Sequence, residues 1–414
     1  MSDVVVVVGA GLAGLVCAQD LNDAGVECVV LERSDDVGGR VRTDELDGFL
    51  LDRGFQILLS AYPQVQRRLN VRELRLGLFE PGALVRARGA FRRVGDPLRR
   101  PRQIPATLSA GVASLSDAAR VARLVLDVRS HSARSLLRRP EVSTATRLAR
   151  ARFSEPFLAS FWRPLFAGIQ LDPELEVSSR RFDVILRMLA SGATGLPRRG
   201  MGAVPTQLAA TLPHAAVRLR APVCSVSGAG VVLEDGERIA ARAVVLATDG
   251  PSAHRLLGGR VADPGSRAAA CCWFSTVGAP LSGPTLMLDG ETGGPAKNIV
   301  VMSEVQPSYA PAGRALVAAA IPGAPALDTA LESHVREQLA RLFGSMSHDW
   351  QLLRTDVIPH GQPDQRPPFH PRRRVALGDG LFVCGDHRDT ASIQGAMFSG
   401  ERTAAAVLRS LRRA

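Results

Sequence analysis

The chain of 414 residues contains no uncharged apolar run of the ~18–20 residues that a membrane-spanning helix needs. Its six cysteines form no CxxC pair and no spacing typical of a metal site. Aromatic residues make up only 5% of the chain, so the stacking surfaces of single-stranded nucleic-acid binders are scarce. The first residues lack the basic and apolar segments of a secretory leader. We therefore expect a cytoplasmic protein with reduced thiols, no metal and no nucleic-acid partner.

Lysine is nearly absent, since Lys297 is the only one, and the formal net charge of +11 comes from arginine. Residues 86–152 hold 16 arginines against four acids, a net of +12, so the rest of the chain sums to −1. This segment has three interpretations: a solvated helical face, a patch that contacts anionic lipid, or a nucleic-acid site, and no recognition motif accompanies the charge. In the second interpretation, residues 86–166 lie peripherally on a membrane. The entrance for a lipophilic substrate would then be formed by Phe153, Phe157, Phe161, Trp162, Leu165 and Phe166.

The start of the chain predicts a strand, a helix and a second strand. A valine run at residues 4–8 that ends at Gly9 is typical of a strand buried on both faces. Apolar residues between 12 and 21 recur at helical spacing, and residues 26–31 form the next apolar run. This order is a βαβ unit, which implies a parallel pair of strands with a right-handed crossover.

Gly9, Gly11 and Gly14 form a GxGxxG motif between the first strand and the helix. The first glycine makes the tight turn, the second lets the backbone approach a pyrophosphate, and the third lets the helix pack close to the sheet. Glu32 ends the second strand, 18 residues after Gly14, close to the ~20 expected for an acid that holds a ribose hydroxyl. The combination predicts dinucleotide binding, and the acid disfavours the 2′-phosphate of NADP.

The middle of the chain has a different pattern. Residues 60–200 show helical periodicity, clearest at Leu108, Val112, Leu115, Ala119, Ala122 and Leu126. From Val223 onward, short alternating runs separated by glycine-containing turns predict an antiparallel meander. Residues 243–247 and 381–384 predict two more buried strands, and a helix is expected from about Ser392 to Leu411.

Further motifs extend the glycine fingerprint. Gly38-Gly39-Arg40 is followed by Thr43, and Gly385-Asp386 precedes a Ser-Ile-Gln-Gly-Ala-Met run that begins at Ser392. With these motifs the sequence resembles the superfamily of flavin-containing amine oxidases and carotenoid (phytoene) desaturases, which are FAD-dependent oxidoreductases. Members carry GxGxxG, then Glu-Arg, then Gly-Gly-Arg-x-x-Ser/Thr. The resemblance is strong over residues 4–60 and 381–405, and fair over 196–250.

The resemblance implies non-covalent FAD and assigns its contacts. Gly385-Asp386 would hold the ribityl and pyrophosphate, Val223 would contact the adenine through its backbone, and residues 54–56 would pass beside the isoalloxazine. The helix after Ser392 would point its N-terminus at the flavin pyrimidine and stabilise the reduced anion. The expected cofactor-binding residues are Gly9, Gly11, Ala13, Gly14, Glu32, Arg33, Gly39, Arg40, Gly54, Phe55, Gln56, Val223, Ala247, Gly385, Asp386, Ser392, Ile393 and Ala396.

The predicted fold class is α/β. A Rossmann-type FAD-binding domain, with a parallel sheet plus a β-meander, is expected from residues 1–60, 196–264 and 361–414. A discontinuous α+β substrate-binding domain is expected from residues 61–195 and 265–360. Since no second GxGxxG occurs, we expect no separate nicotinamide domain, and the electrons would pass to O2 or a quinone.

The motifs also bear on the reaction. Amine oxidases of the superfamily flank the flavin with two aromatic residues, yet the position three residues before Gly395 is Ser392, and the chain has only two tyrosines. This departure favours a lipophilic, isoprenoid- or carotenoid-like substrate that gives up hydride from a C–H bond to flavin N5. The alternatives are an amine or porphyrinogen-type oxidase that uses O2, and a non-redox flavin-dependent isomerase. The catalytic residues stay unassigned, and the candidates are Gln56 and Lys297. Lys297 is a candidate because some flavin oxidases bridge a lysine to flavin N5 through water.

Overall fold

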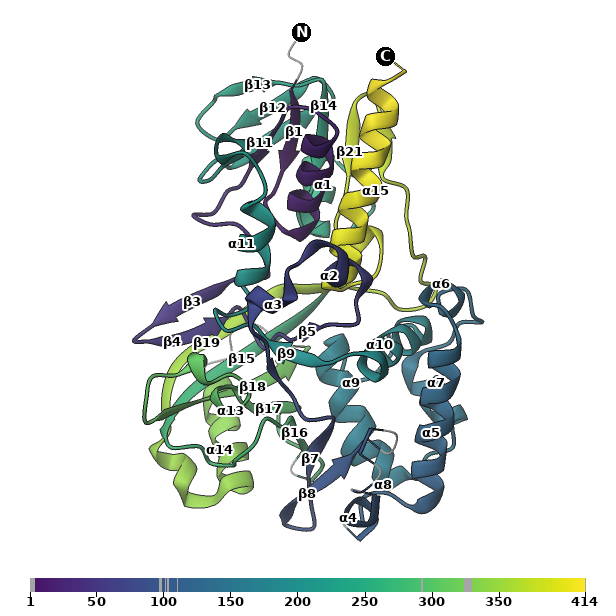
Figure 1. The fold of residues 1–414 in the computed structure, drawn as a ribbon, viewed down its shortest axis with the longest axis vertical. Helices are drawn as coiled ribbons and strands as arrows, with labels where there is room; N and C mark the ends of the chain where they lie inside the picture. Colours follow the sequence, from purple (N-terminus) through teal and green to yellow (C-terminus); the bar gives the residue numbers. More distant parts are fainter. Residues whose placement is uncertain are drawn as a thin grey trace.

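The computed structural model describes residues 4–96, 99–100, 102, 104–109, 111–291, 293–323 and 330–413. Residues 1–3 and 414, which the predicted FAD-binding domain includes, lie outside the described residues. Two sheets organise the chain: one occupies the upper part of Figure 1 and the other the lower part. No helix within the described ranges combines the length and the apolar character needed to cross a bilayer.

The upper sheet has six strands in the order β10-β2-β1-β14-β21-β20. Its strands are parallel except for the last pair, β20 with β21, which is antiparallel. The register places Val5 opposite both Cys28 and Ala243. The strands are β10 (Val217–Arg218), β2 (Cys28–Leu31), β1 (Val5–Val8), β14 (Ala243–Leu246), β21 (Leu381–Val383) and β20 (Ala376–Gly378).

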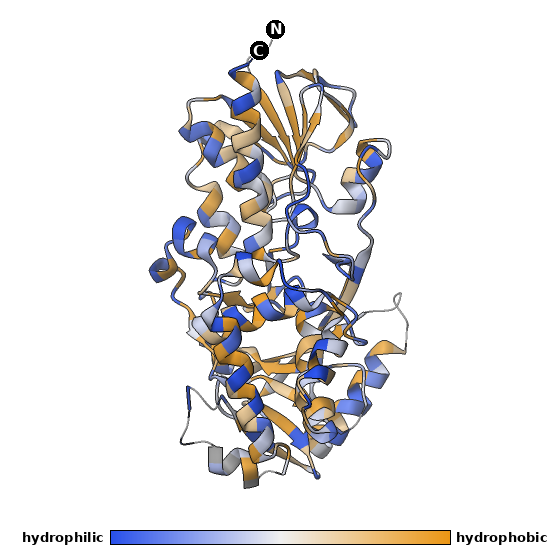
Figure 2. Ribbon diagram, turned by 90° about the vertical axis from the view of Figure 1, so that its right-hand side faces the viewer, coloured by the Kyte–Doolittle hydropathy of each residue, from blue (hydrophilic) through white to orange (hydrophobic). Residues whose placement is uncertain are grey.

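The valine run at residues 5–8 is buried on both faces because the two faces of the sheet are covered by different elements. Side chains alternate along a strand, so Val5 and Val7 join the core under helices α1 (Leu12–Asp23) and α15 (Ile393–Leu411). Val6 and Val8 pack under the meander on the opposite face. Figure 1 shows α1 and α15 side by side, and Figure 2 shows the apolar strands beside the helices in the upper half. The meander consists of β11 (Val223–Ser227), β12 (Gly230–Leu233) and β13 (Arg238–Ala240).

The lower sheet has seven strands in the order β19-β15-β18-β17-β16-β7-β8. Neighbours are antiparallel except β16 and β7, which are parallel. Helix α14 (Leu331–Phe343) packs on one face. The strands are β19 (Gln351–Pro363), β15 (Ser266–Val277), β18 (Arg314–Pro322), β17 (Asn298–Val301), β16 (Met287–Asp289), β7 (Gly82–Ala87) and β8 (Ala90–Gly95).

A group of helices flanks the lower sheet, on the right in Figure 1. They are α4 (Ile104–Ser109), α5 (Leu115–Ser130), α6 (Ala133–Leu136), α7 (Thr144–Arg150), α8 (Glu155–Phe157), a π-helical turn at Leu158–Trp162, α9 (Arg163–Gln170) and α10 (Ser179–Ser191). The remaining elements connect the two sheets or cover their edges. They are β3 (Thr43–Leu46), β4 (Phe49–Asp52), β5 (Leu58–Leu59), β6 (Gly77–Leu78), β9 (Thr194–Leu196), α2 (Pro63–Arg68), α3 (Val71–Leu74), α11 (Ala203–Ala209), α12 (Gly250–Leu256) and α13 (Met302–Val305).

The parallel sheet, the meander and the second sheet confirm the predicted α/β fold class. The predicted domain bounds stay predictions. Strand β19 continues across the boundary that was predicted between residues 360 and 361. The apolar face predicted for the helix near residue 115 is wrong. Leu115 and Leu126 are 71% and 57% exposed, and the buried side of α5 is formed by Leu124, Val125 and Val128. Two of the expected apolar positions are alanines, Ala119 and Ala122, and alanine carries so little apolar surface that it tolerates either face of a helix.

The predicted aromatic entrance is also wrong for most of its members. Phe153, Phe157, Trp162 and Phe166 are at most 6% exposed and pack against one another, with tilted or edge-on rings, in the core of the helical group. Large rings bury more surface than any other side chains, so packing within the helical group outweighs any role at an opening.

Candidate functional site

The GxGxxG turn joins β1 to α1. Gly9 has a φ of +105°, which favours glycine. A Cβ on Gly14 would lie 2.0 Å from the carbonyl oxygen of Gly9 and 3.0 Å from the Cβ of Ala247, so helix α1 can pack this close only with glycine there. A Cβ on Gly11 would meet nothing within 4 Å. The space in front of the first turn of α1, where amides lack intrahelical acceptors, is therefore open to a ligand.

Glu32 is held against this turn. One carboxylate oxygen accepts from the backbone N–H of Ala10 at 2.8 Å, and the other accepts from the N–H and hydroxyl of Ser34 at 2.9 and 2.7 Å. The side chain is buried beside the open space. Arg33, next along the chain, is exposed. The meander begins here too, because the N–H of Ala221 donates to the carbonyl of Glu32, which puts Val223 two residues from that contact.

The second glycine turn lies beside the first. The N–H of Gly38 donates to the carbonyl of Ala10 at 2.8 Å, and a Cβ on Gly39 would lie 3.6 Å from the Cα of Gly11. Thr43, three residues after Arg40, donates its hydroxyl to Asp52 and accepts from the N–H of Gly202. Thr43 therefore links the second glycine turn to Asp52 and to the loop at Gly202.

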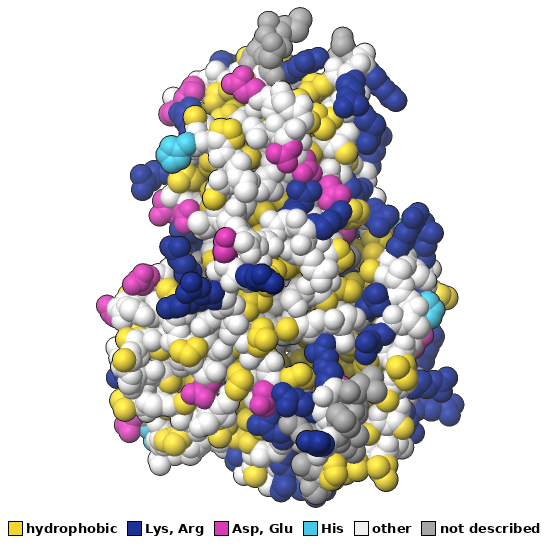
Figure 3. Space-filling model, in the orientation of Figure 1, with side chains coloured by type: hydrophobic (Ala, Val, Ile, Leu, Met, Phe, Trp, Pro, Cys, Tyr) yellow, Lys and Arg dark blue, Asp and Glu magenta, His cyan; other side chains and the backbone are white. Residues whose placement is uncertain are grey.

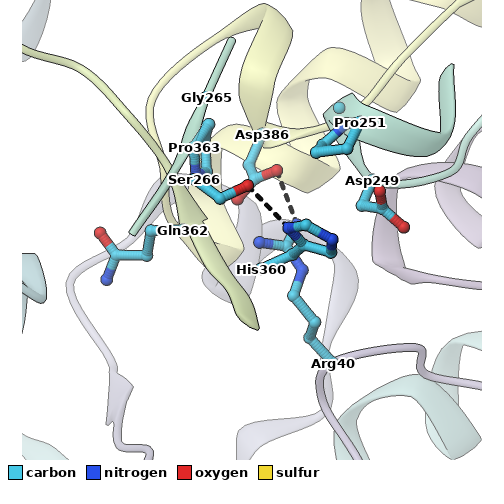
Figure 4. A pocket seen from close by; sticks show the side chains of 10 residues that line it. Arg40, Asp249, Pro251, Gly265, Ser266, His360, Gln362, Pro363 and Asp386 are labelled. Carbon is cyan, nitrogen blue, oxygen red and sulfur yellow. Dashed lines mark hydrogen bonds and ion pairs between the residues drawn. The ribbon is translucent and has the colours of Figure 1, made fainter. Parts of the chain in front are cut away.

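Arg40 joins the glycine turns to both sheets. Its guanidinium donates to Asp386 at 2.7 Å and to the carbonyl of Gly361 at 2.9 Å, and its own carbonyl accepts from Nε2 of Gln56 at 2.7 Å. Figure 4 shows the ion pair in a recess that is also lined by His360 and Ser266, which are hydrogen-bonded to each other. The structure thus brings together three predicted cofactor segments, which are far apart in sequence.

Residues 54–56 lie against β19. Gly54 has a φ of +77°, and a Cβ there would lie 2.5 Å from Cδ1 of Ile358. Asp52, two residues earlier, is fully buried and accepts from Thr43, from the N–H of Met201 and from the hydroxyl of Tyr309. Burial raises the pKa of the Asp52 carboxyl to about 6, although these three hydrogen bonds favour the charged form.

The C-terminal motif starts helix α15. Gly385 has a φ of +142°, and its N–H donates to the hydroxyl of Ser399 at 3.1 Å. Ser392 is the N-cap of α15, and its hydroxyl accepts from the N–H of Gly395 at 3.0 Å. A Cβ on Gly400 would lie 2.2 Å from the carbonyl of Ala13, so α15 crosses directly over the first turn of α1. Ile393 and Ala396 lie half-buried in the first turn of α15.

These residues fit a flavin dinucleotide. The open space at Gly11 sits before the N-terminus of α1, a buried carboxylate stands beside it, and Arg40 offers a cation to phosphate. When bound, FAD supplies the hydride-accepting N5 atom. Glu32 would hold the ribose, the first-turn amides of α1 and Arg40 would hold the pyrophosphate, and the N-terminus of α15 would face the flavin.

A cavity of about 70 Å³ lies next to Ser392, between α2, α10 and the start of α15. One wall is apolar and comes mainly from α10, whereas the end near α15 is polar. The lining residues are Tyr62, Pro63, Ala133, Arg181, Val184, Ile185, Met188, Thr390, Ser392 and Gln394.

Arg181 is the charged residue of this cavity, and sequence reasoning missed it. Its side chain is 3% exposed and donates to Oε1 of Gln362 at 3.2 Å and to the carbonyl of Ala391 at 2.7 Å. Burial lowers the pKa of the Arg181 guanidinium to about 10. The available signal was its spacing, since Arg181 precedes Ile185 by four residues and Met188 by seven, on the apolar face of a helix.

The predicted lysine candidate, Lys297, lies outside this cavity, directly before β17 of the lower sheet. Nζ of Lys297 donates to the carbonyl of Gly294 at 2.9 Å, three residues back in the same turn. Gln56, the other candidate, uses its amide to brace Arg40 and Arg53. Catalytic roles for both residues stay predictions.

A family model described as flavin containing amine oxidoreductase matches residues 12–408. The 15-cis-phytoene desaturase of Synechococcus elongatus is 45% identical over 74 residues, which is 17% of this chain and 15% of that protein, so the chain matches only a small part of this relative's length.

Two solved structures superpose on nearly the whole chain. An oxidoreductase from Methanosarcina mazei does so with a TM-score of 0.74 at 19% identity, covering 97% of this chain and 100% of that one. Putrescine oxidase bound to putrescine does so with a TM-score of 0.68 at 19% identity, covering 99% of each chain. At these identities the likeness shows the fold alone.

Proposed function

The chain belongs to the family of flavin-containing amine oxidoreductases, which are FAD-dependent enzymes, and from that premise we propose that it removes hydride from a C–H bond of a lipophilic, isoprenoid- or carotenoid-like substrate. The observation that carries this proposal is the cavity at Ser392. Its wall of Pro63, Val184, Ile185 and Met188 is apolar, and Ser392 itself uses its hydroxyl to cap α15. Neither feature offers the aromatic pair that would guide an amine nitrogen.

The chain's residues contribute binding and orientation to this chemistry. Substrate carbons that contact the α10 wall are removed from water, at a gain of ~25 cal/mol per Å² of apolar surface. The positive end of the α15 dipole, in front of Ser392, favours the negative charge that collects on the cofactor as the substrate is oxidised. With FAD bound, the substrate would give up a hydride to it and a proton to solvent, and a dissolved acceptor, O2 or a quinone, would take up the two electrons.

A test of the reaction class is anaerobic titration of the holoenzyme, followed at about 450 nm, where oxidised flavin absorbs. An acyclic isoprenoid hydrocarbon in detergent should bleach this band, and air should restore it. Putrescine and a porphyrinogen serve as the comparison substrates. Bleaching by either of them, without bleaching by the hydrocarbon, would overturn the proposal in favour of an oxidase of that class. Product formation with unchanged colour would instead indicate a non-redox isomerase.

We also propose that the segment 86–166 rests on an anionic membrane surface, from which a lipophilic substrate could be taken. Figure 3 shows arginine side chains along the right-hand edge of the lower half, where Figure 1 places α5 to α7. On α5, the exposed Leu115 and Leu126 lie among the arginines at 120, 123 and 129. Exposed leucines flanked by arginines are typical of helices at a lipid interface. Some of the charge is neutralised internally, since Arg139 pairs with Asp127 and Asp183.

A further inference from the structure

We propose that the cavity beside Ser392 binds an anionic oxygen group of the substrate, a carboxylate, through Arg181. The substrate would then be an amphiphile, with its charged end at Arg181 and its apolar body along α10. This inference rests on the proposed function, because it concerns the same site and names the chemical class of its substrate.

The fold alone does not account for the charge of Arg181. Its two hydrogen-bond partners, the side-chain amide of Gln362 and the carbonyl of Ala391, are both neutral. Among the described residues, no carboxylate forms an ion pair with it. Tyr62 and Asp386 raise the pKa of the Arg181 guanidinium less than burial lowers it, and Asp386 is itself paired with Arg40 at 2.7 Å. A buried charge without a counter-ion is costly, so a neutral donor would hold the Ala391 carbonyl more cheaply.

Of the other buried arginines, Arg42 pairs with Asp35 at 2.8 Å, whereas Arg388 donates to the carbonyl of Arg374 and forms no ion pair among the described residues. Arg181 differs from both because it lines a cavity, and two bonds occupy only part of the five N–H donors of a guanidinium. The remaining donors suit a carboxylate, whose two oxygens match the guanidinium fork.

Two further groups make the same end of the cavity attractive to an anion. Tyr62, whose hydroxyl can donate to an anion, lines the cavity together with Ser392. The first turn of α15, which has 19 residues, begins at the same place and brings its positive end. An ammonium group would face Arg181 and this helix end together, so the cavity disfavours a protonated amine.

The apolar part of the cavity lies on the same helix face as Arg181. Val184, Ile185 and Met188 follow it by three, four and seven residues, so they line up along α10 beyond the guanidinium. A ligand with one charged end and an alkyl body therefore meets the charge and the apolar wall in the order in which this helix presents them. This arrangement sets the direction in which the substrate enters.

The experiment is calorimetric titration of the holoenzyme with decanoate, decan-1-ol and decylamine, which share a chain and differ in charge. Decanoate should bind wild type at least about tenfold more tightly than decan-1-ol, since hydrogen bonds to charged groups are the stronger ones. Arg181→Gln should remove this preference, whereas Arg187→Gln should keep it. Arg187 is the matched control because it lies on the same helix and donates to the carbonyl of Arg129. Equal binding of decanoate and decan-1-ol to wild type, or unchanged decanoate binding by Arg181→Gln, would overturn the inference.

Two more variants guard against misfolding of Arg181→Gln. Arg181→Lys keeps the charge and should retain part of the preference for decanoate, and Tyr62→Phe keeps the ring and should lose part of it. If both variants keep the wild-type preference for decanoate over decan-1-ol, the inference fails.

Binding is measured without turnover, so the redox proposal and the carboxylate proposal can be refuted independently. Anaerobic bleaching by an uncharged hydrocarbon, with no preference for decanoate, would retain the redox proposal and remove this one. Decanoate binding through Arg181 without bleaching by any substrate would do the reverse.

Discussion

The glycine turn offers a pair of substitutions that separate cofactor binding from folding. In Gly14→Ala the new Cβ would lie 2.0 Å from the carbonyl oxygen of Gly9 and 3.0 Å from the Cβ of Ala247. Both are parts of the turn and the sheet that cannot rotate away, so helix α1 must move outward. Overpacking of this kind costs about 1–3 kcal/mol, and a backbone contact belongs at the upper end.

Gly11→Ala adds the same methyl group without a clash. Gly11 has a φ of −72° and a ψ of 174°, which any residue adopts, and its Cβ would meet nothing within 4 Å. Alanine is a poorer N-cap than glycine, but it reduces the entropy of the unfolded chain, so the net change in stability should stay within about 0.5 kcal/mol. The methyl occupies the space through which a pyrophosphate reaches the amides of α1. We therefore expect FAD to bind at least about tenfold more weakly, or about 1.4 kcal/mol.

Urea denaturation of the FAD-free proteins and titration of FAD, followed by quenching of flavin fluorescence, measure the two effects. The expected pattern is a lowered urea midpoint for Gly14→Ala alone, and weakened FAD binding with a wild-type midpoint for Gly11→Ala. Wild-type affinity in Gly11→Ala would show that the pyrophosphate does not lie at this turn. A midpoint for Gly11→Ala as low as that of Gly14→Ala would show that the space at Gly11 is not open.

Other parts of the molecule make further predictions. Glu32→Gln should weaken FAD binding about tenfold or more in the same titration, because a charged acceptor for the ribose becomes neutral. The raised pKa of Asp52, about 6, means that the folded form holds the extra proton. The stabilisation of the folded state by this proton is therefore complete below about pH 4 and is lost as the pH rises through 6. Between pH 4 and 7.5, the free energy of unfolding of wild type should fall by up to about 3 kcal/mol relative to that of Asp52→Asn, as measured by urea denaturation. Phe166→Ala should cost about 3–5 kcal/mol of stability without changing vesicle binding, as a core ring would. The double variant Leu115→Asp, Leu126→Asp should lose co-sedimentation with anionic vesicles at unchanged stability; equal sedimentation with wild type would refute the membrane proposal.

Sequence predicted those parts of the structure whose physics is local. The βαβ unit, the two glycine turns and the start of α15 depend on residues within a few turns of one another, and each lies where its motif placed it. The seven-stranded sheet was not predicted in this form. Its hairpin at residues 82–95 lies in a stretch expected to be helical, and it joins strands about two hundred residues further along the chain.

The candidate site divides in the same way. The contacts of Glu32 and Gly38 with the first turn follow from their motifs. The spacing of Arg181 places it on an apolar helix face, but its burial could not be predicted, because its partners Gln362 and Ala391 are about 180 and 210 residues away. A charged residue on an apolar helix face is read as exposed until the tertiary structure shows what covers it.

Strand β19 connects the cofactor segments with the cavity. Gly361 accepts from Arg40, and the next residue, Gln362, accepts from Arg181. Arg40 in turn reaches Asp386 after β21, and Arg181 reaches Ala391 at the start of α15. One strand of the lower sheet and one loop of the upper sheet therefore hold both arginines, and the two sites share a common frame. A substrate anchored at Arg181 is then positioned by the same residues that brace the cofactor turn, so orientation can supply much of the rate without a protein acid or base at the reacting carbon.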